Sequence, residues 1–265
     1  MDDHDAPVRG LRSDDFEIDE DGHAVRIATF SEVSAAGISG SADGRFVTLL
    51  LDDTVGPGGT NIMQSIARLF IAPARKADSV AVVRLTHRED EATGPFLVAR
   101  DHIDDYRSDA LPFFGRETVE NALQAVTSIS RQLEPIADRR KVVICLGRRD
   151  VCDPYLATPE ESLVWSYWRD ALSAAARANV SVYAVDPEGV RGPIDLGDGL
   201  VDGTGGNDFA RSNNFAHIAG SIWAEAGHYY LLGYTPTAKA RELHAINVKV
   251  KGRGLHVRAR HSRGD

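Results

Sequence analysis

The middle of the chain alternates unbroken apolar runs with segments in which apolar residues recur every three or four positions. Four of the runs are FVTLLL (46–51), SVAVVRL (79–85), KVVICL (141–146) and VSVYAV (180–185). The periodic segments are residues 61–76, 117–133, 161–179 and 212–227. Unbroken runs are typical of strands buried on both faces, and the longer spacing is typical of amphipathic helices. The alternation predicts an α/β fold, with a doubly wound, mostly parallel sheet flanked by helices.

Weaker patterns extend this scheme. FLVAR (96–100) is a shorter apolar run that predicts a strand, and HYYLLGY (228–234) predicts the last strand. Residues 188–208 are rich in Gly and Asp, which is typical of a loop. In the segment 61–76, the residues expected on one apolar face are Ile62, Ile66, Leu69 and Phe70.

Both ends of the chain alternate apolar and polar residues, as antiparallel strands with one solvated face do. Residues 14–30 predict a hairpin around the turn Asp21-Gly22. Residues 244–260 predict a second hairpin around Gly252-Arg253-Gly254. Residues 31–44, rich in Ser, Ala and Gly, are expected to be a linker.

The charge distribution bears on how the two ends are arranged. The 265 residues carry 30 Lys and Arg against 39 Asp and Glu, a net charge of −9. Residues 1–30 hold nine acids and three Arg, a net −6, whereas residues 239–265 hold eight bases and two acids, a net +6. A basic end can bind nucleic acid or attract an acidic end. Because a lone hairpin is marginally stable, we expect a discontinuous β-subdomain (1–44 with 238–265) beside an α/β domain (45–237), and no nucleic-acid partner.

Membrane and disulfide patterns are missing from the sequence. No apolar run approaches the roughly 18 residues of a membrane helix, and the acidic start MDDHDAPVRG has no apolar core like that of a signal peptide. The chain has two cysteines, Cys145 in an expected strand and Cys152 in the loop after it. Two cysteines make neither a disulfide framework nor a zinc site without His partners, so two unpaired thiols are expected.

Polar residues follow several of the expected strands, and ligands of open α/β sheets bind at the carboxyl ends of the strands. The candidates are Asp52, Asp53 and Thr54, then Glu117 and Thr118, then Arg148, Arg149 and Asp150, and finally Asp186. Carboxylate and hydroxyl oxygens suit a hard cation such as Mg²⁺. Alternatively, Asp and Thr in these places form turns and cap helices.

Several enzyme motifs are absent. GPGGTN lacks the GK[ST] ending of a phosphate-binding loop, and neither GxGxxG nor the GxSxG of a nucleophile elbow occurs. The sequence therefore contains no complete catalytic set, and no enzymatic activity is expected.

Segments along nearly the whole chain match one family. They are PVRGLRSDDFEIDEDGHAVRIATFS, FVTLLLDDT, RRKVVICLGRRD, ANVSVYAVDPEG, GHYYLLGYTP and INVKVKGRGLHVRARHS. The chain resembles the bacterial VWFA-related proteins first described from Acidobacteria, a branch of the von Willebrand factor type A superfamily. The most distinctive segments are L-x-x-x-DFE-x-x-EDG and YYLLGYTP. The resemblance implies an α/β domain that binds proteins.

Type A domains often bind through a metal-ion-dependent adhesion site. Its first loop reads DxSxS, a second loop supplies a Thr and a third supplies an Asp. The resemblance places Asp52 and Thr54 at the first two positions of that first loop, and Gly56 at the third. Thr118 is the second-loop residue that it implies.

The third loop departs from the family pattern. Arg148 stands where the family has Asp, and Asp150 can replace that Asp only if the loop is rearranged. A guanidinium there repels a divalent cation and can form an ion pair with Asp52 instead. The metal ligands Asp52, Thr54 and Thr118 are therefore expected to form a degenerate site, with no cofactor rather than Mg²⁺ or Mn²⁺.

Three hypotheses about function follow. The first is a non-enzymatic interaction module that binds an unidentified protein through Asp52, Asp53, Thr54, Gly56, Thr118, Arg148 and Asp150. The alternative is a metal-dependent hydrolase or phosphoryl-transfer enzyme that uses Asp52, Asp53 and Asp186. The third is a structural domain whose former site has decayed.

The resemblance also implies a location outside the cytoplasm. Members of the family usually carry a signal peptide and a full leading strand before the PV-x-GL segment. This chain begins inside that strand. Either its true start lies upstream of Met1, or this copy has lost its export signal.

Overall fold

The computed structural model describes residues 1–3, 6–34, 44–86, 92–94, 96–108, 116–136, 139–152, 163–188, 199–209, 212–236 and 244–263. Its central sheet has five strands in the order β6-β5-β4-β7-β8. They are β6 (Ala92–Gly94), β5 (Ser79–Arg84), β4 (Phe46–Leu51), β7 (Lys141–Leu146) and β8 (Val180–Val185). Four strands are parallel, and β6 pairs antiparallel with β5 at the edge. The predicted doubly wound α/β sheet is confirmed.

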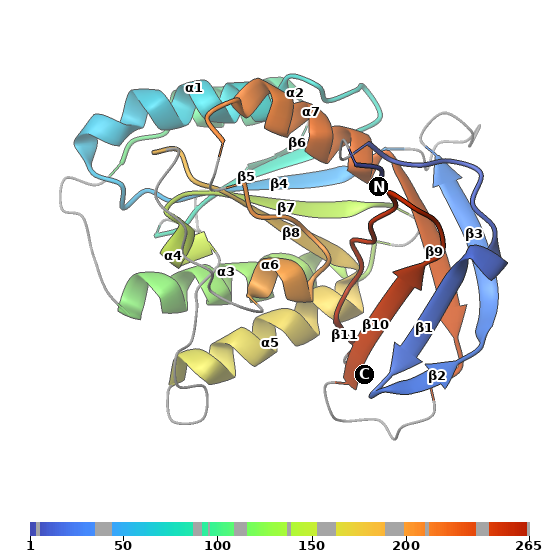
Figure 1. Ribbon diagram of the computed structural model, residues 1–265. Coiled ribbons are helices and arrows are strands. Elements are labelled where there is room, and N and C mark those ends of the chain that lie inside the picture. Colours follow the sequence, from blue (N-terminus) through green and yellow to red (C-terminus); the bar gives the residue numbers. More distant parts are fainter. Residues whose placement is uncertain are drawn as a thin grey trace.

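Helices cover both faces of this sheet (Figure 1). One face packs against α1 (Thr60–Ile71), α2 (Phe96–Asp104) and α7 (Phe215–Ala226). The other packs against α3 (Arg116–Leu133), α4 (Arg149–Cys152), α5 (Leu163–Ala178) and α6 (Leu200–Gly203). Two short 3₁₀ helices are η1 (Ser13–Asp15) and η2 (Pro57–Gly59). Side chains alternate along β4, so that Leu49 and Leu51 enter one apolar core and Leu50 enters the other.

Three expectations for this part were wrong. Residues 96–100 begin the helix α2, in which Ala99 and Ile103, four residues apart, are both buried; a five-residue apolar run does not separate strand from helix. Residues 200–203 form α6 inside the expected loop. In α1, Ile66 and Phe70 are buried as expected, but Ile62 is 53% exposed and Leu69 42% exposed. The buried face of α1 is completed instead by Met63 and Ala67.

The last predicted strand exists but belongs to a separate sheet. It is β9 (His228–Tyr234), which pairs antiparallel with β3 (Ile27–Ser34). Residues 31–34 are therefore strand rather than linker, and the remaining expected linker residues lie outside the described chain, apart from Gly44. The half-exposed side chains of β9 contrast with the full burial of β7 and β8. This exposure agrees with a strand that covers the side of the α/β part rather than entering its sheet.

The two ends of the chain meet in a four-stranded antiparallel sheet, as predicted. Its order is β11-β10-β1-β2, formed by β11 (Ser262–Arg263), β10 (His244–Val250), β1 (Phe16–Glu20) and β2 (His23–Val25). β1 pairs with β10 from Phe16↔Val250 to Glu20↔Ile246. Residues 255–260, expected as a strand, form no ladder, because they cross to the α/β part, where Arg258 contacts Glu225 and Arg260 contacts the carbonyl of Ala176.

The turn between β1 and β2 also fixes β10. Asp21 and Gly22 both have positive φ, 50° and 79°, as the favoured two-residue hairpin turn requires. The Asp21 carboxylate accepts hydrogen bonds from the N–H of Ala245 at 2.9 Å and from Nδ1 of His244 at 2.8 Å. The His244 contact, followed by the Ala245 one, lowers the pKa of Asp21 below its ordinary value. The distinctive EDG motif therefore joins the two ends of the chain.

Opposite charges face each other across the same sheet. Lys249 Nζ lies 3.6 Å from Asp19 Oδ2, and Lys251 Nζ lies 3.4 Å from Glu17 Oε1. The expectation that the acidic and basic ends lie side by side is confirmed. The division into units 1–44 with 238–265 and 45–237 stays a prediction.

A buried ion pair ties the start of β4 to its neighbours. The Arg45 guanidinium donates to Asp78 through Nε at 3.0 Å and Nη2 at 2.7 Å, and its Nη1 donates to the carbonyl of Trp223. The same guanidinium lies 4.3 Å from the centre of the Trp223 ring. The Asp78 carboxylate also accepts the N–H groups of Arg45 and Arg75. The two side chains are 6% and 2% exposed, so every contact is shielded from water.

Candidate functional site

The candidate site lies where β4 and β7 end side by side. The N–H of Asp52 donates to the carbonyl of Leu146 at 2.9 Å and so continues the ladder by one residue. Gly147 follows β7, and a Cβ there would lie 2.4 Å from the Cβ of Asp52. Only glycine leaves room for the Asp52 side chain between the two strand ends.

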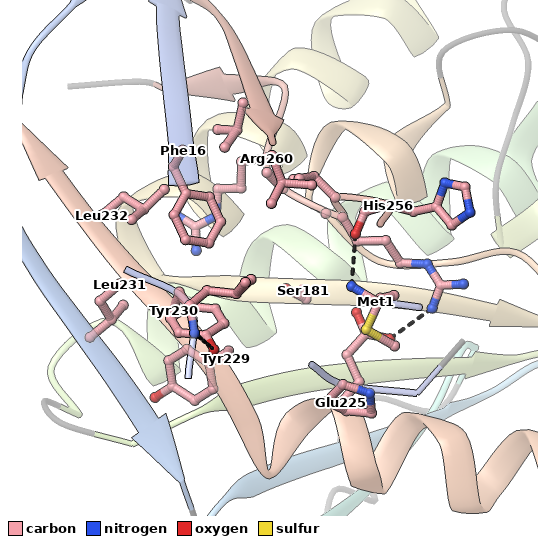
Figure 2. Close-up of a pocket in the computed structure, with 18 of the residues that line it drawn as sticks. Met1, Phe16, Ser181, Glu225, Tyr229, Tyr230, Leu231, Leu232, His256 and Arg260 are labelled. Carbon is pink, nitrogen blue, oxygen red and sulfur yellow. Dashed lines mark hydrogen bonds and ion pairs between the residues drawn. The ribbon is translucent and has the colours of Figure 1, made fainter. Parts of the chain in front are cut away.

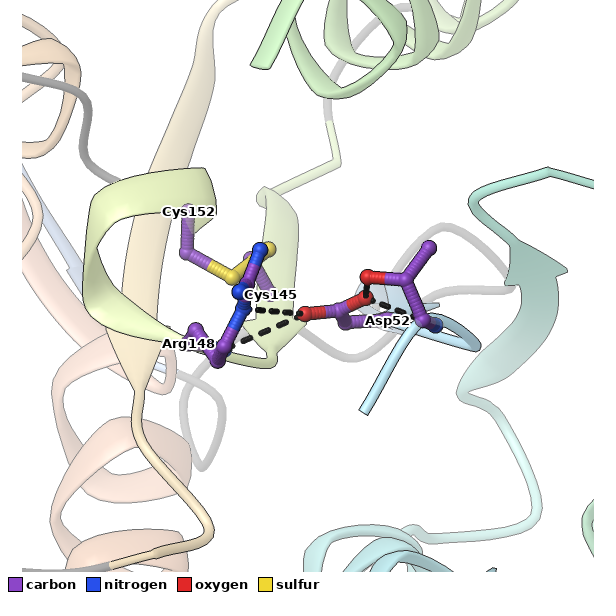
Figure 3. The surroundings of a disulfide bond; sticks show 5 residues. Asp52, Cys145, Arg148 and Cys152 are labelled. Atoms are coloured by element: carbon purple, nitrogen blue, oxygen red, sulfur yellow. Dashed lines mark hydrogen bonds and ion pairs between the residues drawn. A yellow bond between two sulfur atoms is a disulfide. The ribbon is translucent and has the colours of Figure 1, made fainter. Parts of the chain in front are cut away.

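Hydrogen bonds from this chain surround the Asp52 carboxylate, which is fully buried. Its Oδ1 accepts from the N–H of Thr54 at 2.9 Å and from the Thr54 hydroxyl at 2.6 Å. Its Oδ2 accepts from the N–H of Arg148 at 3.3 Å, and Nε of Arg148 lies 3.8 Å away (Figure 3). The ion pair expected between Asp52 and Arg148 is therefore present.

The other predicted carboxylates are directed elsewhere. Asp53 is buried and accepts from the N–H and the hydroxyl of Thr86, at 3.0 and 2.5 Å, beyond the end of β5. Asp186 accepts from the N–H of Glu188 at 2.8 Å, as a turn residue does. Asp150 lies in α4, and its side chain is outside the described part of the chain. The predicted acidic residues thus do not share one set of contacts.

Gly56 and Thr118 occupy the two remaining predicted positions. Gly56 is buried, has a φ of +82°, and precedes η2. Its carbonyl accepts from the hydroxyl of Ser108 at 2.5 Å, and that hydroxyl also lies 2.8 Å from Oγ1 of Thr60. Thr118 is buried in the first turn of α3. The hydroxyl next to Asp52 comes from Thr54.

Sequence reasoning missed two residues that hold this loop, Tyr106 and Ser108. The Tyr106 hydroxyl donates to the carbonyl of Asp52 at 2.8 Å, and its side chain is buried. Both residues follow α2, the segment that had been expected to be a strand. A helix in that place carries the chain back to the loop after β4, and a strand prediction gave no reason to look there.

Cys145 and Cys152 form a disulfide, so the expectation of two unpaired thiols was wrong. Cys145 lies in β7 and Cys152 ends α4, one helical turn that folds back over the strand (Figure 3). Their Cα atoms are 5.6 Å apart, within the range that a disulfide spans. The bridge closes the short loop that carries Arg148. A helical turn directly after the strand is the signal that would have predicted it.

Removing this bridge is expected to destabilise the protein. For a closed loop of eight residues, loop-closure entropy gives about 2.5 kcal/mol. The double variant Cys145→Ala, Cys152→Ala should lower the free energy of unfolding by about that amount in urea titrations. Adding reductant should shift the wild type toward the variant and leave the variant unchanged. Equal stabilities of wild type and variant would show that the bridge does not constrain the unfolded chain.

The residues around Asp52 do not fit a divalent cation. A cation there needs the oxygen lone pairs of Asp52 and of the hydroxyl, together with further oxygen ligands. The Thr54 hydroxyl instead donates its proton to Asp52, and Arg148 places a positive charge beside Oδ2. Within the described ranges, no three His, Cys, Asp or Glu side chains gather as metal ligands.

Comparison with protein families and with curated proteins found no match. Among solved structures, proximal thread matrix protein 1 from the mussel byssus is similar in two crystal structures. The first has a TM-score of 0.47 at 13% identity and covers 77% of this chain and 50% of the mussel chain. The second, with a zinc-occupied MIDAS motif, has a TM-score of 0.49 at 13% identity and covers 78% and 50%.

This chain spans about half the length of those mussel proteins. At such identity and TM-score, the similarity bears on neither the site nor the activity. The α/β architecture that the sequence resemblance implied is nevertheless the architecture observed. None of the helices in the described ranges is long and apolar enough to cross a membrane.

Proposed function

We propose that this chain is a protein-binding module of the von Willebrand factor type A kind that works without a metal ion. The observation that carries the proposal is the contact between Arg148 and Asp52. The ion pair and the Thr54 hydroxyl supply from within the chain the charge and contacts that a cation would otherwise supply. The binding face would be the loop 52–60 together with the segment from Arg148.

The exposed side chain of Ile62 supports this choice of face. It lies in the first turn of α1, directly after the loop that begins at Asp52, and is 53% exposed. An exposed large apolar residue beside a rigid loop provides the kind of anchor that protein interfaces use. The alternative, a hydrolase using Asp52, Asp53 and Asp186, has less support because the three carboxylates accept hydrogen bonds from separate groups.

The disulfide bears on where such a module would act. Disulfides persist in secreted and periplasmic proteins and are rare in a reducing cytosol. The bridge between Cys145 and Cys152 therefore supports an oxidising compartment. This agrees with the location outside the cytoplasm that the sequence resemblance implies.

Quantitative affinity capture with paired variants tests the proposal. The wild type, Ile62→Asp and Leu69→Asp are immobilised and exposed to extracellular proteins of the source cells. Leu69 is the matched control, because it is an exposed apolar residue on the same helix, two turns from the loop. We expect a partner that the wild type and Leu69→Asp retain and Ile62→Asp loses at least tenfold, a loss of about 1.4 kcal/mol or more.

The same captures in EDTA and in Mn²⁺ separate the metal-free proposal from a working adhesion site. Retention of the partner should be equal in both buffers. Release by EDTA would overturn the metal-free mechanism. Retention of the same proteins by Ile62→Asp would overturn the choice of face.

A further inference from the structure

A cavity lies at the opposite end of the molecule from Asp52. It has a volume of about 470 Å³ and lies between the antiparallel strands and the amino ends of β7 and β8, where it is lined by Arg140, Asn179 and Ser181. Volumes of this size are typical of small-molecule sites. The binding face proposed above involves none of these residues.

The antiparallel strands give the cavity an apolar wall. Its lining includes Phe16, Leu232, Val248 and Val250 from β1, β9 and β10. The Phe16 and Tyr230 rings pack with their centres 5.3 Å apart. Figure 2 shows the side chains of Phe16, Tyr230 and Leu232 together at one end of the cavity. A wall of this composition accepts an alkyl chain or an aromatic ring.

Three arginines also line the cavity, and they differ in what balances their charge. Arg258 forms an ion pair with Glu225 at 3.0 Å. Arg260 donates to the carbonyl of Ala176 at 2.9 Å and to Oδ1 of Asn179, which are neutral acceptors. Arg258 thus has a carboxylate partner, and the contacts of Arg260 leave its charge in place.

Arg140 is the least satisfied of the three. Its Nη2 donates to the hydroxyl of Ser181 at 3.0 Å, and its guanidinium lies 4.9 Å from the Tyr229 ring centre. Its Nε is buried and has no hydrogen-bond partner within the described residues. A buried guanidinium nitrogen without an acceptor is costly. An oxygen that entered the cavity beside it would remove that cost.

Neighbouring cations add to the positive charge at this end. Lys141, buried next to Arg140 in the chain, donates to the carbonyl of Ala178 at 2.7 Å. Burial and then the charge of Arg260 lower the pKa of Lys141. Burial and then the charge of Arg140 lower the pKa of Arg260 to about 10. A bound anion would relieve both effects.

We propose that this cavity binds an amphipathic carboxylate, with its carboxyl group at Arg140 and Arg260 and its apolar body against Phe16, Leu232 and Val248. Guanidinium groups pair with carboxylates in a two-toothed geometry, so arginines suit this head group. The apolar wall selects against small hydrophilic anions. The excess of positive charge selects against an amphiphile with a cationic head.

Isothermal titration of the full chain with decanoate, below its micelle concentration, tests this proposal. Decanoate should bind saturably with one site per chain, and decyltrimethylammonium of the same tail length should not. Arg140→Gln should raise the Kd of decanoate roughly tenfold or more, as expected for a lost charged hydrogen bond. Arg253→Gln is the matched control, because it removes the same charge from an exposed turn residue outside the cavity.

Photolabelling the wild type with a diazirine fatty acid keeps the test independent of any variant. Crosslinks should fall on Phe16, Leu232 or Val248, and excess decanoate should suppress them. Equal binding of the two head groups, an unchanged Kd in Arg140→Gln, or crosslinks confined to other surfaces would each overturn the proposal.

Discussion

Replacing Arg45 with methionine is expected to lower the free energy of unfolding by about 3–5 kcal/mol, because it leaves the carboxylate of Asp78 buried without its guanidinium partner. The Asp78 side chain is only 2% exposed, so water cannot take over the lost contacts. The variant also loses the hydrogen bond to the Trp223 carbonyl and the stacking on its ring. Urea unfolding followed by tryptophan fluorescence and far-UV circular dichroism measures the loss.

Arg68→Met is the matched control for this prediction. Arg68 and Asp104 also form an ion pair, at 2.6 Å, but both side chains are 42% exposed. An exposed pair contributes about 0–1 kcal/mol. A loss in Arg45→Met no larger than the loss in Arg68→Met would show that burial of the Arg45 pair does not set its importance.

The pH dependence of the Arg45 effect follows from Asp78. Burial by itself raises the pKa of Asp78, but hydrogen bonds from the Arg45 side chain and from the N–H groups of Arg45 and Arg75 outweigh burial and lower the pKa below 3.8. A lowered pKa contributes stability that is present above the unfolded value and is lost as the pH falls through the folded value. The difference between wild type and Arg45→Met should therefore be largest near pH 7 and should shrink below about pH 4.

Deleting residues 239–265 should unfold the antiparallel sheet at the chain ends. The deletion removes β10, the partner of β1 over five residue pairs, and exposes Ile18, now 3% exposed. The remaining β1–β2 hairpin cannot stand alone in water. Amide hydrogen exchange at Phe16–Val25 should accelerate by about 100-fold or more, while β4 and β7 keep their protection. Unchanged protection at Phe16–Val25 would contradict the pairing.

Lys249→Glu separates the two causes of this pairing. Lys249 faces Asp19 across the sheet but is 60% exposed, so reversing its charge should cost less than about 1 kcal/mol. We expect the backbone ladder and the apolar face to hold the ends together, with charge as a minor contribution. A loss of protection in Lys249→Glu as large as in the deletion would reverse that ranking.

The features predicted correctly from sequence have strong local signals. Unbroken apolar runs located β4, β7 and β8, because a strand with both faces buried has no polar positions. Alternation and opposite charge located the sheet between the two ends. The pair of Asp52 and Arg148 followed from one rule, that parallel strands end at the same edge of a sheet.

The features that were missed depend on tertiary structure. The disulfide needed a one-turn helix to bring Cys152 back over β7, and the contact of Tyr106 with Asp52 needed α2 to be a helix. The partner of β9 could not be read from HYYLLGY, since Tyr and Leu suit strands in either sheet. The cavity draws its lining from both ends of the chain, so no single segment carries a signal for it.

The meeting of the two ends in one sheet has a practical consequence for attachment. The N and C labels in Figure 1 both lie on the side of the sheet away from α4, the turn that follows β7 beside Asp52. A tag, a surface or a fused protein joined to either end would therefore sit behind the molecule. The loop that begins at Asp52 would face outward from a bead or a sensor chip, whichever end is tethered.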